Sequence, residues 1–170
     1  MPHGNEPHRF DRLPATAEER AVEGRPTRQA VVSWWDERFG IDPDTFQHHT
    51  FWERGAGKIW AFRDDFDQPT PVAIEGLGMA VLRTRQEHWK PTTEAAQRWG
   101  TAASRNVIHL DEPAAEAFLA GEDQDLAWDG DWGYLIAAND LAGAPEPIGV
   151  GLYVHGELQS KVPKGRQREF

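Results

Sequence analysis

Four cations, Lys161, Lys164, Arg166 and Arg168, stand within eight residues near the end of the chain. Glu169 is the one acid close to them, although the whole chain carries a formal net charge of -10. Such a local concentration of positive charge in an acidic protein is typical of a surface that binds phosphate groups. The alternative is a solvated, frayed terminus, because chain ends are commonly disordered.

A second group of cations, Arg83, Arg85 and Lys90, surrounds Trp89. The sequence predicts a strand over 76–85, and alternation along it would place Arg83 and Arg85 on one face. Guanidinium groups donate two parallel hydrogen bonds to phosphate and stack on bases. The alternative is a solvent face on which both arginines pair with carboxylates. Trp89 either stacks on a base or packs in the core, and its type favours the core.

The N-terminal part of the chain begins with signals for short helices. Thr16-Ala-Glu-Glu19 is a capping box and predicts a helix that Gly24 closes. A second helix is expected after Pro26, with apolar residues at helical spacing, and ends at Gly40. Residues 51–62 then predict two strands joined by a glycine-rich turn.

The rest of the chain alternates strand and helix signals. We expect helices at 93–99 and 112–120, and further strands at 107–110, 132–138 and 148–154. A strand hairpin is expected just before the terminal cations. Few helices among many strands predict an α+β fold.

The composition divides this chain into three parts. Residues 1–14 are polar and rich in His and Pro, and predict a disordered tail. Residues 15–70 form a small N-terminal α/β unit of helices and a hairpin. Residues 71–170 form the main domain, with Pro69 and Pro71 at the junction.

Several short motifs in the main domain occur in a family-specific order: Ile74-Glu-Gly-Leu-Gly-Met-Ala-Val-Leu82, Trp89-Lys-Pro-Thr-Thr-Glu-Ala-Ala96, Asn106-Val-Ile-His-Leu-Asp111, Ala117-Phe-Leu-Ala-Gly-Glu122, and Ile148-Gly-Val-Gly151 with Pro163-Lys-Gly165. In this order residues 71–170 resemble the C-terminal PUA-like RNA-binding domain of Fmu/Sun-type RNA cytosine methyltransferases. The resemblance implies a PUA-like β pseudobarrel and an RNA partner.

The closing motif departs from the family pattern of Lys-Asn, two residues, Pro-Lys-Gly and an Arg. Gln159 and Ser160 stand at the Lys-Asn positions, and Lys164 keeps the family lysine. Gln167 occupies the usual arginine position, with Arg166 and Arg168 on either side of it.

Methyltransferase chemistry is not expected of this chain. That family attacks the base with a cysteine thiolate and holds the methyl donor on a glycine-rich turn, whereas this sequence contains no cysteine. The pairs Gly76-Leu-Gly78 and Gly149-Val-Gly151 lack the third glycine and a following helix. The histidines of the chain have no spacing typical of a metal site. We therefore expect no catalytic residue, no cofactor and no metal, and neither S-adenosylmethionine binding nor methylation.

The sequence thus predicts a non-catalytic RNA-binding protein acting on ribosomal or transfer RNA in ribosome assembly, RNA modification or translation. The predicted RNA contacts are the cations and aromatic residue introduced above: Lys161, Lys164, Arg166, Arg168, Arg83, Arg85, Lys90 and Trp89. An alternative is a protein adaptor that docks a separate RNA methyltransferase or a ribosomal protein. An ASCH-type hydrolase is disfavoured because its Gly-x-Lys-x-x-Glu-x-Arg pattern is missing. The RNA species, its sequence and the oligomeric state stay open.

The charge composition indicates a cellular setting. The chain has 28 acidic residues against 18 Lys and Arg, and its only lysines are Lys58, Lys90, Lys161 and Lys164. An acidic, lysine-poor surface is typical of a halophilic, archaeal cytosol; the alternative is an acidic protein from a GC-rich genome. The start lacks an apolar signal region, and the apolar runs are too short to cross a bilayer. A cytoplasmic location with no membrane partner is expected.

The excess of acid predicts stability that depends on salt. Like charges repel one another across the folded surface at low ionic strength, and at 1 M salt the Debye length falls to about 3 Å. The unfolding temperature should therefore rise steeply with KCl in a thermal melt followed by circular dichroism. An unfolding temperature that stays constant between low and molar KCl would contradict the halophile hypothesis.

Overall fold

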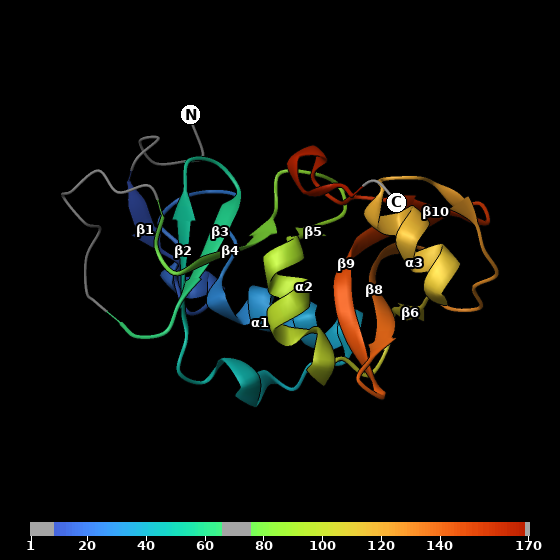
Figure 1. Cartoon of the computed structure of the whole chain (residues 1–170). Coiled ribbons are helices and arrows are strands. Elements are labelled where there is room, and N and C mark those ends of the chain that lie inside the picture. The colour runs from blue at the N-terminus through green and yellow to red at the C-terminus, as the bar shows by residue number, and fades with distance from the viewer. Residues whose placement is uncertain (1–8, 66–75, 169–170) are drawn as a thin grey trace. The chain divides into compact units, whose positions relative to one another are not determined.

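The computed structural model describes residues 9–65 and 76–168. The chain separates into two compact units, unit 1 from Met1 to Lys90 and unit 2 from Pro91 to Phe170 (Figure 1). The boundary that the sequence predicts, between residues 70 and 71, lies outside the described residues.

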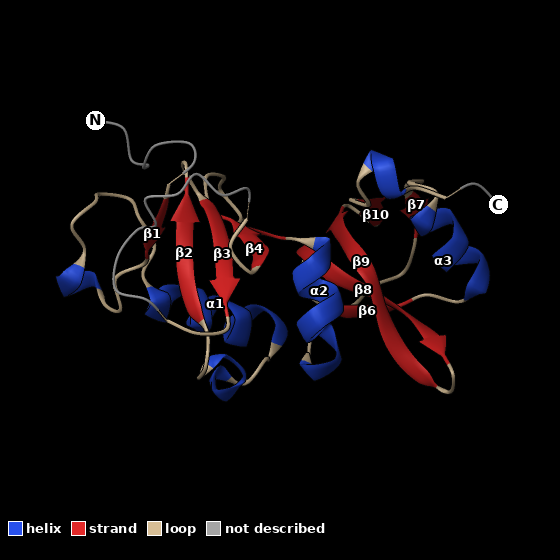
Figure 2. Cartoon of the chain, turned by 60° about the vertical axis from the view of Figure 1, so that its left-hand side comes forward, coloured by secondary structure: helices blue, strands red, loops and turns tan. Residues whose placement is uncertain are grey.

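In its described residues, unit 1 contains one α-helix and a sheet whose first four strands pair antiparallel. Its elements are β1 (Phe10–Arg12), the 3-10 turn η1 (Ala17–Glu19), α1 (Arg28–Phe39), the 3-10 turn η2 (Pro43–Phe46), β2 (Thr50–Arg54), β3 (Lys58–Phe62) and β4 (Met79–Arg83), with β5 (Lys90–Pro91) at the division. The strand order is β1-β2-β3-β4-β5. Figure 2 shows α1 behind β2 and β3.

The predicted helix between Pro26 and Gly40 is confirmed as α1. The Thr27 hydroxyl caps its first turn by accepting a hydrogen bond from the backbone N–H three residues on, at 3.0 Å. Gly40 ends it with a left-handed φ of 64°. Val31, Trp35 and Phe39 recur every four residues and are fully buried, so they form the core side of the helix.

The predicted hairpin over 51–62 is also confirmed, as β2 and β3. Alternation separates its side chains onto two faces. Phe51, Ile59 and Ala61 are buried on one face. Trp52 and Trp60 pair on the opposite face, where Trp52 belongs to a small second apolar cluster.

Two expectations for the N-terminal segment need correction. Residues 10–12, predicted as part of a disordered tail, form β1, because fully buried Phe10 anchors them in the second apolar cluster. The helix predicted from the capping box is one 3-10 turn, η1. Glu19 accepts a hydrogen bond from the backbone N–H of Ala15, at 3.3 Å, which stabilises only this turn.

Unit 2 has two short helices and a mixed sheet. Its elements are α2 (Thr93–Trp99), the 3-10 turn η3 (Gly100–Ala102), β6 (Val107–His109), α3 (Glu112–Leu119), β7 (Gln124–Asp125), β8 (Gly133–Leu141), β9 (Ala144–Val154), β10 (Glu157–Ser160) and the 3-10 turn η4 (Lys164–Arg166). The strand order is β6-β8-β9-β10-β7, with β6 parallel to β8 and the other pairs antiparallel.

The fold is α+β, as the sequence predicts, and both helices of unit 2 lie where expected. Thr92 and Asp111 cap them with side-chain hydrogen bonds. The β8–β9 hairpin is longer than predicted and turns at Ala142 and Gly143, both with positive φ. The strands of the described residues form two open sheets and no closed barrel. No helix in these residues is long and apolar enough to cross a bilayer.

Candidate nucleic-acid interface

Three cations lie side by side across neighbouring strands of unit 1. Arg54 of β2 pairs in register with Lys58 of β3, and Lys58 pairs with Arg83 of β4. Directly paired residues share one face of an antiparallel sheet. Arg83 is exposed, and the other two are half-buried. We call Arg54, Lys58 and Arg83 the cation row.

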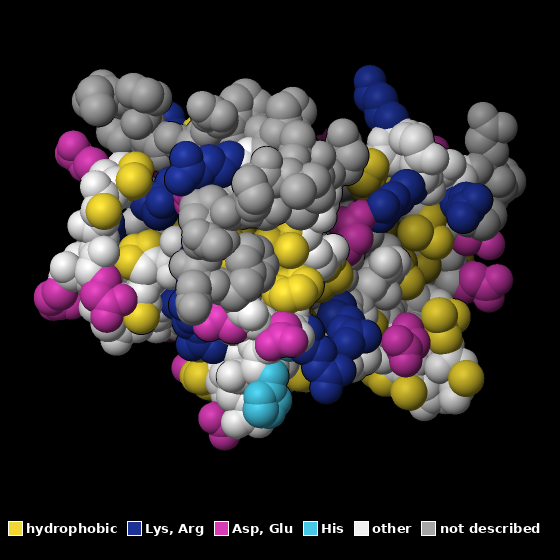
Figure 3. Space-filling model, turned by 90° about the vertical axis from the view of Figure 1, so that its left-hand side faces the viewer, with side chains coloured by type: hydrophobic (Ala, Val, Ile, Leu, Met, Phe, Trp, Pro, Cys, Tyr) yellow, Lys and Arg dark blue, Asp and Glu magenta, His cyan; other side chains and the backbone are white. Residues whose placement is uncertain are grey.

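Aromatic rings support two members of the cation row. The guanidinium carbon of Arg54 lies 5.6 Å from the ring centroid of Phe10, and the Lys58 Nζ lies 5.1 Å from that of Trp60. Each contact is worth about 0.5–1 kcal/mol at an exposed site. Like charges on directly opposite residues cost a similar amount. The rings therefore offset the repulsion between the cations of the row. On the surface, Figure 3 shows Lys and Arg side chains gathered in separate clusters on one face of the molecule.

Arg85 joins the row by a route other than strand alternation. β4 ends at Arg83, so the alternation predicted through residue 85 does not extend to it. The backbone N–H and the hydroxyl of Thr84 instead donate to the carbonyl oxygen of Gly57, at 2.8 and 3.3 Å. Gly57 has a φ of +81°, and the Arg85 side chain fills the space that a Cβ at Gly57 would need. The turn between β2 and β3 thus positions exposed Arg85.

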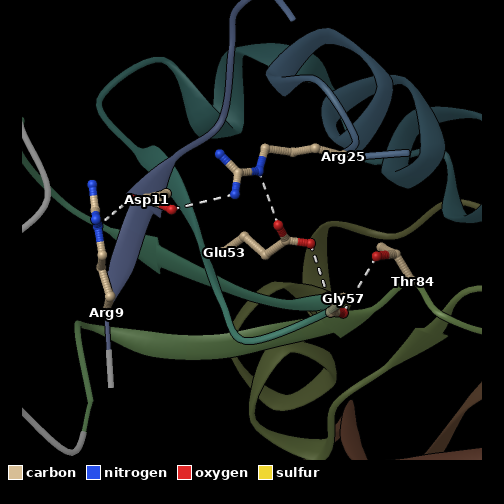
Figure 4. Close-up of polar contacts among 6 residues, drawn as sticks. All are labelled: Arg9, Asp11, Arg25, Glu53, Gly57 and Thr84. Atoms are coloured by element: carbon tan, nitrogen blue, oxygen red, sulfur yellow. Dashed lines mark hydrogen bonds and ion pairs between the residues drawn. The ribbon is translucent and has the colours of Figure 1, made fainter. Parts of the chain in front are cut away.

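A buried ion pair holds this turn (Figure 4). Glu53, 2% exposed, accepts a hydrogen bond from Nε of Arg25 at 2.9 Å. Its second oxygen accepts the backbone N–H of Gly57, also at 2.9 Å. Arg25 further contacts Asp11 of β1 at 3.3 Å, and Arg9 contacts the same carboxylate at 3.1 Å. One network therefore connects β1, β2 and the turn beneath Arg85.

The other predicted residues of unit 1 lie near the division. The Trp89 ring is half-buried, with its centroid 6.3 Å from that of Trp34 on α1. This contact supports packing rather than base stacking for Trp89. Lys90 begins β5 and is half-buried.

The C-terminal cations of unit 2 lie on an ordered segment through residue 168. Its backbone is fixed by hydrogen bonds from Lys161 to Val150 and from Arg168 to Leu119, at 3.0 and 2.9 Å. Arg166 forms an ion pair with Glu94, at 2.5 Å, which neutralises part of the cluster. The Lys161 ammonium donates to a Gln159 side chain at 3.3 Å.

Unit 2 also holds a cleft of about 430 Å³ beside the loop between α2 and β6. Its walls include Arg105, Asn106 and Trp128. Asn106 is buried with a φ of 57° and donates to Asp131 at 3.4 Å. None of the predicted RNA-binding residues lines this cleft. Over residues 9–65 and 76–168, no three His, Asp or Glu side chains come together as a metal site.

Sequence reasoning missed two members of the cation row, Arg54 and Lys58. A signal was present, because a hairpin over 51–62 with a turn at Gly55–Gly57 places these residues directly opposite each other. The pairing of Lys58 with Arg83 carried no such signal, since it joins strands separated by a long connection.

Comparison with known proteins gives a partial match. Residues 2–78 match a family described as a family of unknown function (DUF7122). The match covers most of unit 1 and none of unit 2. No curated protein matches the chain.

Two glycines of one turn allow a controlled test of how Arg85 is positioned. Gly55 and Gly57 both have positive φ, so alanine at either costs about 1–2 kcal/mol of backbone strain. Only a Cβ at Gly57 would also meet Arg85, whose backbone nitrogen lies 3.0 Å from that point. Gly57→Ala should thus lower the free energy of unfolding by about 1–3 kcal/mol more than Gly55→Ala, measured by chemical denaturation. Equal losses would show that Arg85 does not rest on the turn.

Proposed function

We propose that the protein binds RNA, and that the cation row with Arg85 contacts the phosphate backbone. The observation that carries the proposal is the alignment of Arg54, Lys58 and Arg83 across three strands in a chain of net charge -10. Neighbouring strands lie about 4.8 Å apart, so the row is a narrow line of positive charge. Such a line suits the closely spaced phosphates of a nucleic acid.

The two exposed arginines support a phosphate partner over a solvated surface. Neither Arg83 nor Arg85 forms an ion pair with a carboxylate within residues 9–65 and 76–168. Their guanidinium forks therefore retain donors that match phosphate oxygens. Arg166, by contrast, is already paired with Glu94. The cation row is accordingly the main contact, and the C-terminal cations are a second one.

The support for a PUA-like domain related to that of Fmu/Sun-type RNA methyltransferases is the motif order in the sequence, together with the α+β content of unit 2. Helices α2 and α3 alternate with β6 and are followed by antiparallel strands β8, β9 and β10. The family motif Pro163-Lys-Gly165 lies at η4, where Lys164 is exposed. We propose that unit 2 is such a pseudobarrel, acting without a methyltransferase domain on ribosomal or transfer RNA in a haloarchaeal cytoplasm.

An adaptor function is the second candidate, and one exposed residue favours it. Trp132 is 56% exposed, and its ring packs against His155 with centroids 4.8 Å apart. Two carboxylates, Glu157 and Asp125, are directly paired on the adjacent strands β10 and β7. An exposed tryptophan and a pair of carboxylates in the same unit suit arginine side chains of a basic partner protein, since Trp is the best cation–π acceptor.

The RNA proposal predicts a specific loss on neutralising two arginines. The double variant Arg83→Gln/Arg85→Gln should bind RNA about tenfold more weakly at low KCl, with a salt slope reduced by about 1.4 for two lost contacts to a single strand. The matched control is Arg20→Gln/Arg98→Gln, which removes two exposed arginines that do not belong to the row. Fluorescence anisotropy with end-labelled transfer RNA and ribosomal RNA fragments over several KCl concentrations measures both quantities.

Two results would contradict the RNA proposal. One is a parent protein that binds neither RNA class at any KCl concentration at which it is folded. The other is a double variant that binds as tightly as the control throughout. Thermal melts of each variant in the same buffers verify that they stay folded.

The adaptor function predicts a different loss. Trp132→Ala should weaken binding of a synthetic arginine-rich peptide by about tenfold, as expected for a central aromatic contact. Leu141→Ala is the matched control, because Leu141 is the other large apolar residue exposed in the described part of the chain, at 51%. Isothermal titration calorimetry measures both affinities. Equal affinities of the two variants would eliminate Trp132 as a docking residue.

A further inference from the structure

Unit 1 contains a polar cleft of about 700 Å³ that the sequence analysis did not anticipate. The end of β1, the start of α1, the loop before β2 and the segment after β3 all contribute to it. Its charged residues include three arginines and two aspartates, namely Arg12, Arg28, Arg63, Asp64 and Asp65. All of its described lining residues lie inside the segment 2–78 that matches the family of unknown function.

The carboxylates of the cleft are already engaged. Asp65 forms an ion pair with Arg12, with 2.8 Å between Oδ2 and the guanidinium nitrogen. Asp64 accepts the backbone N–H of Asp65 at its Oδ1, at 2.9 Å. Within residues 9–65 and 76–168, neither aspartate forms an ion pair with Arg28 or Arg63. Among the described lining residues, three guanidinium groups against two carboxylates give one excess positive charge, before either lining histidine is protonated.

Arg28 and Arg63 are the two arginines of the cleft that form no ion pair with a carboxylate among the described residues. Arg28 donates to the carbonyl oxygen of Phe46 at 2.7 Å, and its guanidinium carbon lies 5.9 Å from the Phe51 ring centroid. These contacts fix its position without neutralising it. Arg63 is exposed and forms no ion pair with a carboxylate among the described residues.

The wall beside Arg63 is also fixed. Thr50, the first residue of β2, donates its hydroxyl to the carbonyl oxygen of Asp64 at 2.6 Å. The same hydroxyl accepts the indole N–H of buried Trp52 at 2.8 Å. The segment that follows β3 is thereby attached to the start of β2. Donors held in place in this way lose less conformational entropy when a ligand binds.

We propose that this cleft binds a phosphate group. Forked guanidinium donors match phosphate geometry and form charge-assisted hydrogen bonds with it. The three arginines come from separate segments and all line the cleft, and several guanidinium groups match the several oxygens of a phosphate better than those of a planar carboxylate. Phosphate binding by the cleft does not depend on the RNA-binding function proposed above. The identification of RNA as the source of the phosphate does rest on that function.

The test uses the full chain and inorganic phosphate as the probe. Phosphate is titrated at constant ionic strength while amide and arginine Nε signals are followed by ¹⁵N NMR. Saturable shifts are expected at residues 47–50 and 63–65. Arg63→Gln should raise the phosphate Kd about threefold or more, the scale of one lost exposed charge contact. Arg20→Gln, an exposed arginine of the same unit outside the cleft, should leave the Kd unchanged.

Arg12→Gln is a second variant in case Arg63→Gln does not fold, and it too should raise the Kd. Shifts that do not saturate would overturn the proposal. An unchanged Kd in a folded cleft variant would overturn it as well.

Two RNA probes then distinguish the source of the phosphate. Oligouridylates with a 5′-phosphate or a 5′-hydroxyl are compared in the same titration. Tighter binding of the 5′-phosphorylated oligouridylate would show that the cleft binds a terminal phosphate. Equal binding of the two oligouridylates, weakened in both cases by Arg63→Gln, would show that the cleft binds a backbone phosphate. If the protein binds inorganic phosphate but neither oligouridylate, the phosphate site in the cleft stands and the proposed RNA-binding function is rejected. RNA binding that depends on Arg83 and Arg85 but not on Arg63 or Arg12 rejects RNA as the source of the phosphate in the cleft and leaves the proposed function standing.

Discussion

The arrangement of unit 1 depends on a buried ion pair between Arg25 and Glu53. Removing one partner of such a pair costs about 3–5 kcal/mol, because the other charge is left buried without compensation. Here the pair also connects segments distant in sequence, since Glu53 binds the backbone of Gly57 while Arg25 reaches Asp11 of β1. Gly57 in turn accepts the hydrogen bonds of Thr84. The position of exposed Arg85 is therefore determined by a charge pair in the interior.

The cation row, unlike the buried ion pair, destabilises the sheet through repulsion between its charges. Repulsion between Arg54, Lys58 and Arg83 opposes folding, and the rings of Phe10 and Trp60 offset repulsion within the row. An anion bound along the row removes this repulsion. Because a ligand that binds only the folded state stabilises it by mass action, RNA binding and the stability of unit 1 are linked in the proposed function.

The sequence predicted those features that local chemistry determines. Helix α1 followed from a proline before it and a glycine after it, and the β2–β3 hairpin followed from a glycine-rich turn between alternating runs. The sequence did not predict three other features: the register of Lys58 with Arg83, the cleft around Arg63 and the buried partner of Glu53. Each of these joins residues from separate segments, and no local pattern encodes which strands become neighbours. The resemblance to a PUA-like domain covers residues 71–170, which include Arg83 but not Glu53, Lys58 or Arg63, so it did not predict how these residues come together.

In the halophilic cytosol that we propose for this protein, high salt would determine which of these charges are useful for recognition. At 1 M salt the Debye length of about 3 Å removes long-range steering, and counterion release contributes little to phosphate binding. What remains are short hydrogen bonds whose donors are already in place. Arg85 on the Gly57 turn and Arg28 against the Phe46 carbonyl have such support, whereas Lys164 is exposed on a 3-10 turn. In a halophilic cytosol, recognition would accordingly depend on the arginines of unit 1 more than on the denser positive charge at the C-terminus.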